Sequence, residues 1–348
     1  MIYLCPTYDY ELFLGGSSYT EKEVLIDQTD ILLDIYEKRE AKLTLFADVW
    51  SLIKYRELGQ HEFPNLADNQ MKDALRRGND VQLHIHPQWV NAKRSEGKWE
   101  FNKREYSLGD FEYEDNSSVS DREVVVRKAV EYLEDTLKEQ MPGYDVIAYR
   151  AGGYCSEPFE DNCKILHKYG IVLDSSVVAG LKKSDYPITY DYSDRTNNVA
   201  YHLDGNMMEL PLGTVRSFRE KCYYRMNYPI YVNNAPRGYY ITSVDKVAQS
   251  KVKKLINKSS FLLDSSKGYM MTFDERRWDG ILYLMERILK GIDYVGRDVI
   301  LTMVGHPKVL NERLIDNTDR FLTEIRAKYG NDLAFATMTD IWKMKFKK

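Results

Sequence analysis

Short apolar runs with β-strand character alternate with longer segments of helical periodicity along most of the chain. Runs rich in β-branched and aromatic residues predict strands at residues 1–7, 42–47, 81–86, 145–149, 171–173, 299–304 and 333–337. Apolar positions three and four apart predict helices at residues 24–38, 65–77, 121–138, 158–169, 251–263, 278–292, 311–329 and 340–348. Strands that alternate with helices of this length are typical of a parallel sheet. The pattern therefore predicts an α/β fold, and we expect the sheet to close into a barrel.

Two stretches interrupt this alternation. Residues 91–120 are charged and contain several Gly and Tyr residues, and residues 182–250 are irregular apart from weak strand character around residues 207–211. The chain contains no evident linker and no internal repeat, so nothing in it marks a boundary between domains. We therefore expect a single domain, residues 1–348, with loop insertions near residues 91–120 and 182–250.

Polar side chains suited to catalysis or metal binding follow the predicted strands. They are Asp9, Glu11, Asp48, His84, His86, Arg150, Asp174 and His306. The carboxyl ends of barrel strands meet at one rim, so we expect these side chains to gather there. Most other charges fall on the predicted helix surfaces. This segregation favours an enzyme over a purely structural protein.

Two histidines at one strand end indicate a metal site. His84 and His86 are two residues apart, so strand alternation puts both imidazoles on one face, and Pro87 is expected to end the strand. Asp9 and Glu11 are also two apart and therefore share a face. A metal hydrolase uses about three protein ligands and one open position for water, which leaves one carboxylate to act as a base.

The segment after the strand at residues 145–149 adds an arginine and two glycines. A neighbouring arginine keeps a catalytic carboxylate ionised, and Arg150 is the candidate. Glycine lets the backbone approach a ligand closely, so a peptide N–H near Gly153 and Tyr154 is expected to stabilise a developing oxyanion. His306 follows an apolar strand and is expected to protonate the leaving amine.

The order of these motifs resembles the polysaccharide deacetylases, carbohydrate esterase family 4. The resemblance covers nearly the whole chain and rests on Thr7-Tyr8-Asp9, His84-Ile85-His86-Pro87, Arg150-Ala151-Gly152-Gly153-Tyr154, Asp174-Ser175-Ser176 and Leu301 to His306. It implies a distorted seven-stranded (β/α) barrel with loop insertions, a divalent metal and hydrolysis of N-acetyl or O-acetyl groups on sugars.

The resemblance also implies a role for each matched residue. It matches Asp9 to the catalytic base, His306 to the general acid, Arg150 to the residue that orients the base, Asp174 to the fourth catalytic motif, and His84 and His86 to the metal-binding histidines. Three features depart from the family pattern. Tyr10 stands where a second aspartate is usual, so the ligand role passes to Glu11. The histidines are two residues apart rather than four, and no tryptophan follows Asp174.

Composition restricts the partners and the compartment. A formal net charge of −4 without a long Lys/Arg block argues against nucleic acid. No apolar run approaches the roughly 18 residues of a membrane helix, so no transmembrane segment is expected. Residues 1–6 lack the features of a signal peptide, and we expect a cytoplasmic protein. The four scattered cysteines are expected to be free thiols.

The expected function is metal-dependent removal of acetyl groups, N-acetyl rather than O-acetyl, from a sugar or polysaccharide precursor. Zinc is the expected metal, with nickel, cobalt or iron as alternatives. Three other functions fit the same residues: a non-catalytic glycan-binding protein of this fold, a metal-dependent amidohydrolase acting on a small non-sugar amide, and a non-haem iron oxygenase. The sequence carries no signal for an oligomeric state.

Overall fold

The computed structural model describes residues 1–95, 97–102, 104–111, 121–185, 187–203, 206–228, 238–240 and 259–347. Most of the strands in this part of the chain form one sheet. The strands of this sheet are β1 (Ile2–Tyr10), β3 (Thr44–Asp48), β4 (Asp80–Ile85), β7 (Ala148–Ala151), β8 (Leu173–Asp174), β11 (Tyr201–His202), β12 (Met208–Glu209), β16 (Val299–Gly305) and β17 (Leu333–Phe335).

The central strands of this sheet are parallel. They follow the order β12-β8-β7-β4-β3-β1-β16, and each pairs in parallel with its neighbour. β17 also pairs with β1, and β11 adds an antiparallel edge. The sheet curls so far that Leu212, shortly after β12, forms a parallel bridge with Thr302 of β16 at the other end of the order. The predicted α/β class with a parallel sheet is confirmed.

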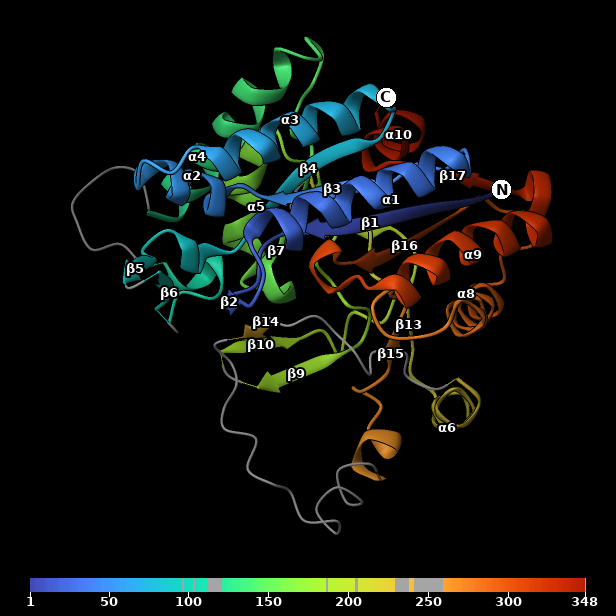
Figure 1. Cartoon of the computed structure of the whole chain (residues 1–348). Helices are drawn as coiled ribbons and strands as arrows, with labels where there is room; N and C mark the ends of the chain where they lie inside the picture. Colours follow the sequence, from blue (N-terminus) through green and yellow to red (C-terminus); the bar gives the residue numbers. More distant parts are fainter. Residues whose placement is uncertain are drawn as a thin grey trace.

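Helices pack around the sheet (Figure 1). They are α1 (Asp27–Lys38), α2 (Val49–Glu57), α3 (Glu62–Arg76), α4 (Asp121–Lys138), α5 (Phe159–Lys168), α6 (Phe218–Asn227), α8 (Trp278–Ile292), α9 (Glu312–Tyr329) and α10 (Met338–Ile341). A π-helical turn, Lys22–Ile26, leads into α1, and another, Trp342–Phe346, extends α10. Each of the long helices buries an apolar stripe, as Ala67, Met71 and Ala74 show for α3.

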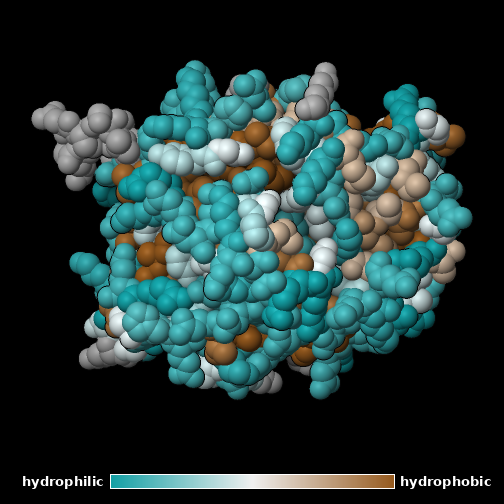
Figure 2. Space-filling model, turned by 90° about the horizontal axis from the view of Figure 1, so that it is seen from above, coloured by the Kyte–Doolittle hydropathy of each residue, from teal (hydrophilic) through white to brown (hydrophobic). Residues whose placement is uncertain are grey.

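Seen from above, the outer surface of the molecule is mainly hydrophilic, with apolar side chains interspersed (Figure 2). This is the expected outcome when amphipathic helices turn their apolar stripes toward the sheet. One hydrophobic cluster of buried residues runs from Ile2 in β1 to Ile325 in α9. Among the residues that the structure describes, none of the helices combines the length and the apolar character needed to cross a membrane.

Within the described residues, four two-stranded hairpins or strand pairs lie outside the sheet. They are β5 (Lys93–Ser95) with β6 (Lys98–Glu100), β9 (Lys182–Asp185) with β10 (Ile188–Asp191), β13 (Thr214–Val215) with β15 (Tyr269–Met270), and β2 (Gly15–Ser17) with β14 (Gly238–Tyr240). Most of these strands fall in or beside the stretches predicted as insertions. Short 3₁₀ turns follow three of the sheet strands, at Pro87–Trp89, Gly152–Tyr154 and Pro307–Val309.

The helices agree with the prediction best where the apolar periodicity is long. Both α4 and α8 have the predicted bounds. Two helices, α2 and α6, were not predicted, because α2 follows β3 without a break and α6 has little amphipathic pattern. Of the helix predicted at residues 251–263, residues 251–258 lie outside the described residues. The structure describes all four cysteines, and none of them forms a disulfide bond, as the sequence predicts.

Candidate metal centre and active site

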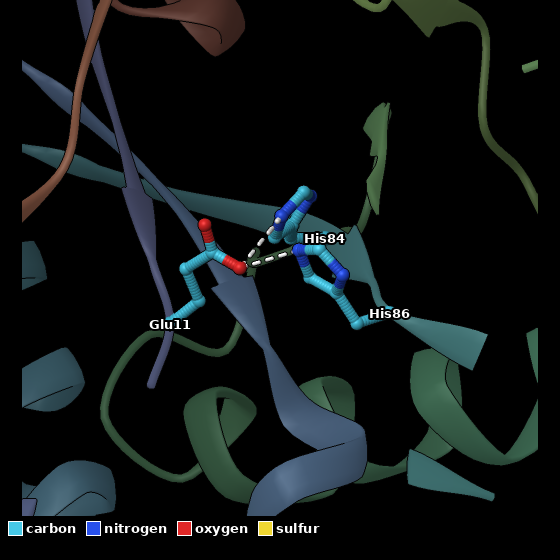
Figure 3. Close-up of side chains that lie close together, drawn as sticks. All are labelled: Glu11, His84 and His86. Atoms are coloured by element: carbon cyan, nitrogen blue, oxygen red, sulfur yellow. Dashed lines mark ion pairs between the residues drawn. The ribbon is translucent and has the colours of Figure 1, made fainter. Parts of the chain in front are cut away.

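The ends of β1 and β4 bring one carboxylate and two imidazoles together. Glu11 follows β1 directly, whereas His84 lies in β4 and His86 follows it. Both strands pair in parallel with β3, so their carboxyl ends reach the same edge. Glu11 Oε2 lies 3.7 Å from His84 Nε2 and in still closer contact with His86 Nε2. Figure 3 shows the three side chains pointing toward one another.

These three atoms fit a divalent cation. Glu11 Oε2, His84 Nε2 and His86 Nε2 are all buried, and apart from their contacts with one another none has a hydrogen-bond partner among the described residues. Buried polar atoms are normally satisfied, so three unsatisfied ones converging within 4.8 Å of one another are unusual in a folded protein. One carboxylate and two neutral imidazoles form a typical zinc donor set with room for a water molecule. The residues therefore fit the metal that the sequence predicts.

Hydrogen bonds behind the two imidazoles fix their orientation. His84 Nδ1 lies 2.8 Å from the carbonyl oxygen of Arg150, which only an Nδ1–H can satisfy, and this leaves Nε2 with a lone pair. His86 Nδ1 lies 3.0 Å from the side-chain amide nitrogen of Gln88. With this amide turned over, Gln88 Oε1, which is buried without a hydrogen-bond partner among the described residues, accepts from Nδ1–H and leaves Nε2 for the metal. A Cβ atom on Gly152 would lie 2.7 Å from His86 Nδ1, so this position requires glycine for the close approach of β7 to the imidazole.

A second group of possible ligand atoms lies beside the first and is already occupied by cationic side chains. It consists of Asp9, Glu11 and His306. Asp9 Oδ1 lies 2.7 Å from Arg150 Nη1, and Glu11 Oε1 lies 2.8 Å from the ammonium group of Lys308. A metal cation in this second group would be repelled by the positive charges of Arg150 and Lys308. The pair of histidines with Glu11 Oε2 is therefore the better cation site, and Lys308 is a site residue that the sequence motifs did not reveal.

Arg150 holds the carboxylate of Asp9 in its ionised form. The guanidinium is fully buried, lies 4.2 Å over the Phe46 ring, and donates from Nη1 to Asp9 and to Thr7 Oγ1, both at 2.7 Å. Its Nε and Nη2 donate to the carbonyl and hydroxyl of Ser175. Burial raises the pKa of Asp9, but the charges of Arg150, His84 and His306 together lower it by more, so the pKa lies below its usual value.

His306 is held by a second residue that the sequence motifs did not reveal. Asp274 accepts from the backbone N–H of His306 at 2.9 Å, and its other oxygen lies 2.7 Å from His306 Nδ1. His306 Nε2 in turn lies 3.4 Å from oxygens of both Asp9 and Glu11. Burial lowers the pKa of His306, but Asp274 and then Asp9 raise it well above its usual value, which favours the protonated imidazole. Asp274 follows the apolar run at residues 269–273, as the other site residues follow strands.

A cavity of about 160 Å³ opens onto these groups. Leu14, Tyr106, Tyr154 and Ile188 line it together with Asp9, Glu11 and His306. Gly153 and Tyr154 also lie at the cavity wall, and both have positive φ angles of 59° and 65°. The structure thus puts the predicted oxyanion residues beside the predicted base, acid and metal ligands.

Asp174 and Asp48 lie behind the cavity rather than on it. Asp174 accepts from the hydroxyl of Ser176 at 2.5 Å and faces the buried carboxyl of Glu209. Burial raises the pKa of Asp174 to about 6. Asp48 accepts from the backbone N–H of His86 at 3.2 Å, so it supports a metal-site histidine. Asp274, not Asp174, is the carboxylate that contacts His306.

Comparisons with known proteins give the fold. No protein-family model matches the chain, and no curated protein matches it by sequence. A branching enzyme of the GH57 type from the archaeon Pyrococcus horikoshii is similar in structure, with a TM-score of 0.52 at 10% identity over 99% of this chain and 71% of that one. A "probable polysaccharide deacetylase" from Pseudomonas aeruginosa PAO1 has a TM-score of 0.49 at 10% identity over 99% of this chain and 91% of that one.

The Puue allantoinase is similar to the same extent. Its TM-score is 0.49 at 10% identity, over 99% of this chain and 90% of that one. The identities of all three proteins to this chain are low. The similarity to the branching enzyme, whose TM-score is above 0.5, therefore supports the fold alone, and the activity must be argued from the site itself.

Proposed function

We propose that this chain is a metal-dependent hydrolase that removes acetyl groups from a sugar or polysaccharide precursor, with N-acetyl groups preferred over O-acetyl groups. The observation that carries the proposal is the convergence of Glu11 Oε2, His84 Nε2 and His86 Nε2, all buried and with no hydrogen-bond partner in the described residues other than one another. We further propose that residues 1–348 form one catalytic domain built on a seven-stranded (β/α) barrel.

The protein's own side chains supply the proton transfers. Asp9, kept ionised by Arg150, accepts the proton of the attacking water. His306, kept protonated by Asp274, donates its Nε2 proton to the leaving nitrogen. Glu11, His84 and His86 would hold a divalent cation, with zinc preferred, which when bound would polarise the water and the acyl carbonyl.

The backbone near Gly153 and Tyr154 supports the same reaction. Gly153 and Tyr154 line the cavity and have positive φ angles, and we assign to a peptide N–H there the stabilisation of negative charge on the acyl oxygen. Asp174 supports this turn from behind, because it accepts from Ser176, which in turn accepts from the backbone N–H of Ala151 at 2.8 Å. Asp174 is therefore assigned a positioning role.

The size of the cavity favours a second candidate, hydrolysis of a small non-sugar amide. At about 160 Å³ the cavity is smaller than the roughly 300 Å³ at which ordinary ligand pockets begin. An acetamido group fits such a space, whether it belongs to a sugar that stays outside or to a small free amide. Comparing acetate release from N-acetylglucosamine with that from acetamide separates the two candidates.

Metal content and turnover test the proposal together. Wild-type protein purified without added metal should contain about one zinc per chain and release acetate from N-acetyl sugars, and EDTA should abolish the release. Asp9→Asn should keep the metal and lose turnover, whereas His84→Ala should lose both. His61→Ala, at an exposed histidine away from the cavity, is the matched control and should behave as wild type.

Other outcomes would contradict the proposal in distinct ways. Full metal content without turnover on any acetylated sugar or amide would point to a glycan-binding protein. If Asp9→Asn lost the metal while Glu11→Gln kept it, Asp9 would be the metal ligand and Glu11 the general base. Oxygen-sensitive iron in place of zinc would favour an oxygenase.

A further inference from the structure

One cationic side chain at the cavity is not committed to an acid of the described residues. Lys183 of the β9–β10 hairpin lines the same cavity as Asp9, Glu11 and His306. The side chain is half-buried, and it makes no ion pair and no hydrogen bond within the part of the chain that the structure describes. Its charge is therefore available to a ligand.

The other charges at the cavity are already matched. Arg150 pairs with Asp9 at 2.7 Å, and Lys308 pairs with Glu11 at 2.8 Å. His306 pairs with Asp274, which lies behind it. Among the described residues that line the cavity, Lys183 is therefore the cation left over. Its positive charge attracts an anionic group and repels a cationic one.

The position of Lys183 is fixed by the hairpin that carries it. Ile188 of β10 packs against Gly153, where an added Cβ would lie 3.2 Å from its Cγ2 atom. Tyr192, just after β10, donates a hydrogen bond to the carbonyl of Tyr154 and stacks on Tyr190, with ring centroids 4.9 Å apart. The hairpin is thus attached to the turn that forms the cavity wall.

Strand alternation separates Lys183 from its neighbour Lys182. Successive residues of a strand point to opposite faces, and Lys182 pairs with Asp191 on the exposed face of the hairpin. The two lysines have the same chemistry and adjacent positions, but only Lys183 lines the cavity. Lys182 is therefore a matched control for any effect of Lys183.

We infer that the substrate is an acetylated sugar that carries an anionic group, a phosphate or a carboxylate, and that Lys183 binds this group. The inference rests on the proposed function. The cavity of about 160 Å³ takes the acyl group, so the sugar and its anionic substituent stay at the mouth, within reach of the flexible Lys183 side chain.

The test compares neutral and anionic acetylated sugars. Acetate release is measured for N-acetylglucosamine, N-acetylglucosamine 1-phosphate and N-acetylmuramic acid with wild type, Lys183→Met, Lys183→Arg and Lys182→Met. Forming a hydrogen-bonded charge pair at a partly buried site raises kcat/KM by about tenfold to hundredfold. We expect wild type to prefer an anionic sugar by this factor, and we expect Lys183→Met to lose the preference through KM while kcat stays unchanged.

The remaining variants define the specificity further. Lys183→Arg and Lys182→Met should keep the preference, and added salt should weaken it. Preference for the phosphate alone or for the carboxylate alone identifies the anionic group. Equal kcat/KM for neutral and anionic sugars in wild type, or an undiminished preference in Lys183→Met, would overturn the inference while leaving the deacetylase proposal intact.

A binding measurement separates failure of the inference from failure of the proposed function. If no sugar is turned over, calorimetry with N-acetylglucosamine 1-phosphate still reports on Lys183. Binding to wild type that weakens about tenfold or more in Lys183→Met would support the inference although the proposed activity had failed. Equal binding by both proteins would overturn the inference.

Discussion

Arg150→Met would leave the buried carboxylate of Asp9 without the guanidinium group that pairs with it. Asp9 is 2% exposed, and Arg150 is fully buried and does not line the cavity, so water that reaches Asp9 from the cavity cannot take the place of the lost guanidinium. Removing one partner of a buried ion pair costs about 3–5 kcal/mol, because the remaining charge stays desolvated. The variant also loses the hydrogen bonds to Thr7 and Ser175. We therefore expect the free energy of unfolding to fall by about 3–5 kcal/mol.

The measurement is urea unfolding of EDTA-treated protein at pH 7, followed by circular dichroism. Arg127→Met is the matched control, since Arg127 pairs with Glu131 on the surface of α4 with side chains 40% and 53% exposed. That substitution should cost at most about 0.5 kcal/mol. Neutralising the second charge as well, in Arg150→Met/Asp9→Asn, should restore about 1–3 kcal/mol relative to Arg150→Met alone.

Two results would refute this reasoning. A cost below about 1 kcal/mol for Arg150→Met would mean that water reaches Asp9 and that the carboxylate is not held by the guanidinium. A double variant no more stable than Arg150→Met would mean that the loss arises from packing on Phe46 rather than from the unpaired charge. In either case Arg150 would not be the residue that keeps Asp9 ionised.

Two further predictions concern carboxylates that lie around the site. Burial raises the pKa of Asp174 to about 6 and the pKa of Glu209 well above its usual value. As pH rises, the unfolded chain therefore loses these two protons at a lower pH than the folded chain does. The free energy of unfolding should consequently fall as pH rises from about 4 to beyond 6. Urea unfolding at pH 5 and pH 8 should show a smaller fall for Glu209→Gln, and an unchanged fall would contradict the assignment. Asp274→Asn should lower kcat for acetate release by about 10²- to 10⁴-fold at unchanged zinc content, because His306 loses the partner that keeps it protonated. A kcat near that of wild type would mean that Asp274 does not keep His306 protonated.

Local patterns were sufficient for much of the fold. The bounds of α4 and α8 follow from apolar periodicity, which is a property of neighbouring residues. The strand predicted at residues 145–149 is instead β7 at Ala148–Ala151, because its pairing with β4 and β8 determines where the strand begins and ends. Helix α6 was not predicted because its burial depends on residues far away in the chain. One of them is Tyr269, against which Tyr224 of α6 packs.

The sequence by itself determined which strands end in ligands and titratable groups, because strand alternation and the segregation of polar residues are local properties. Asp9, Glu11, His84 and His86 can be identified from these properties alone. Only the tertiary structure decided how the charges are paired. The contacts of Lys308 with Glu11, Asp274 with His306 and Asp174 with Glu209 join residues that lie far apart in the chain. Electrostatic pairing depends on distance in space, and the curl of the sheet sets those distances.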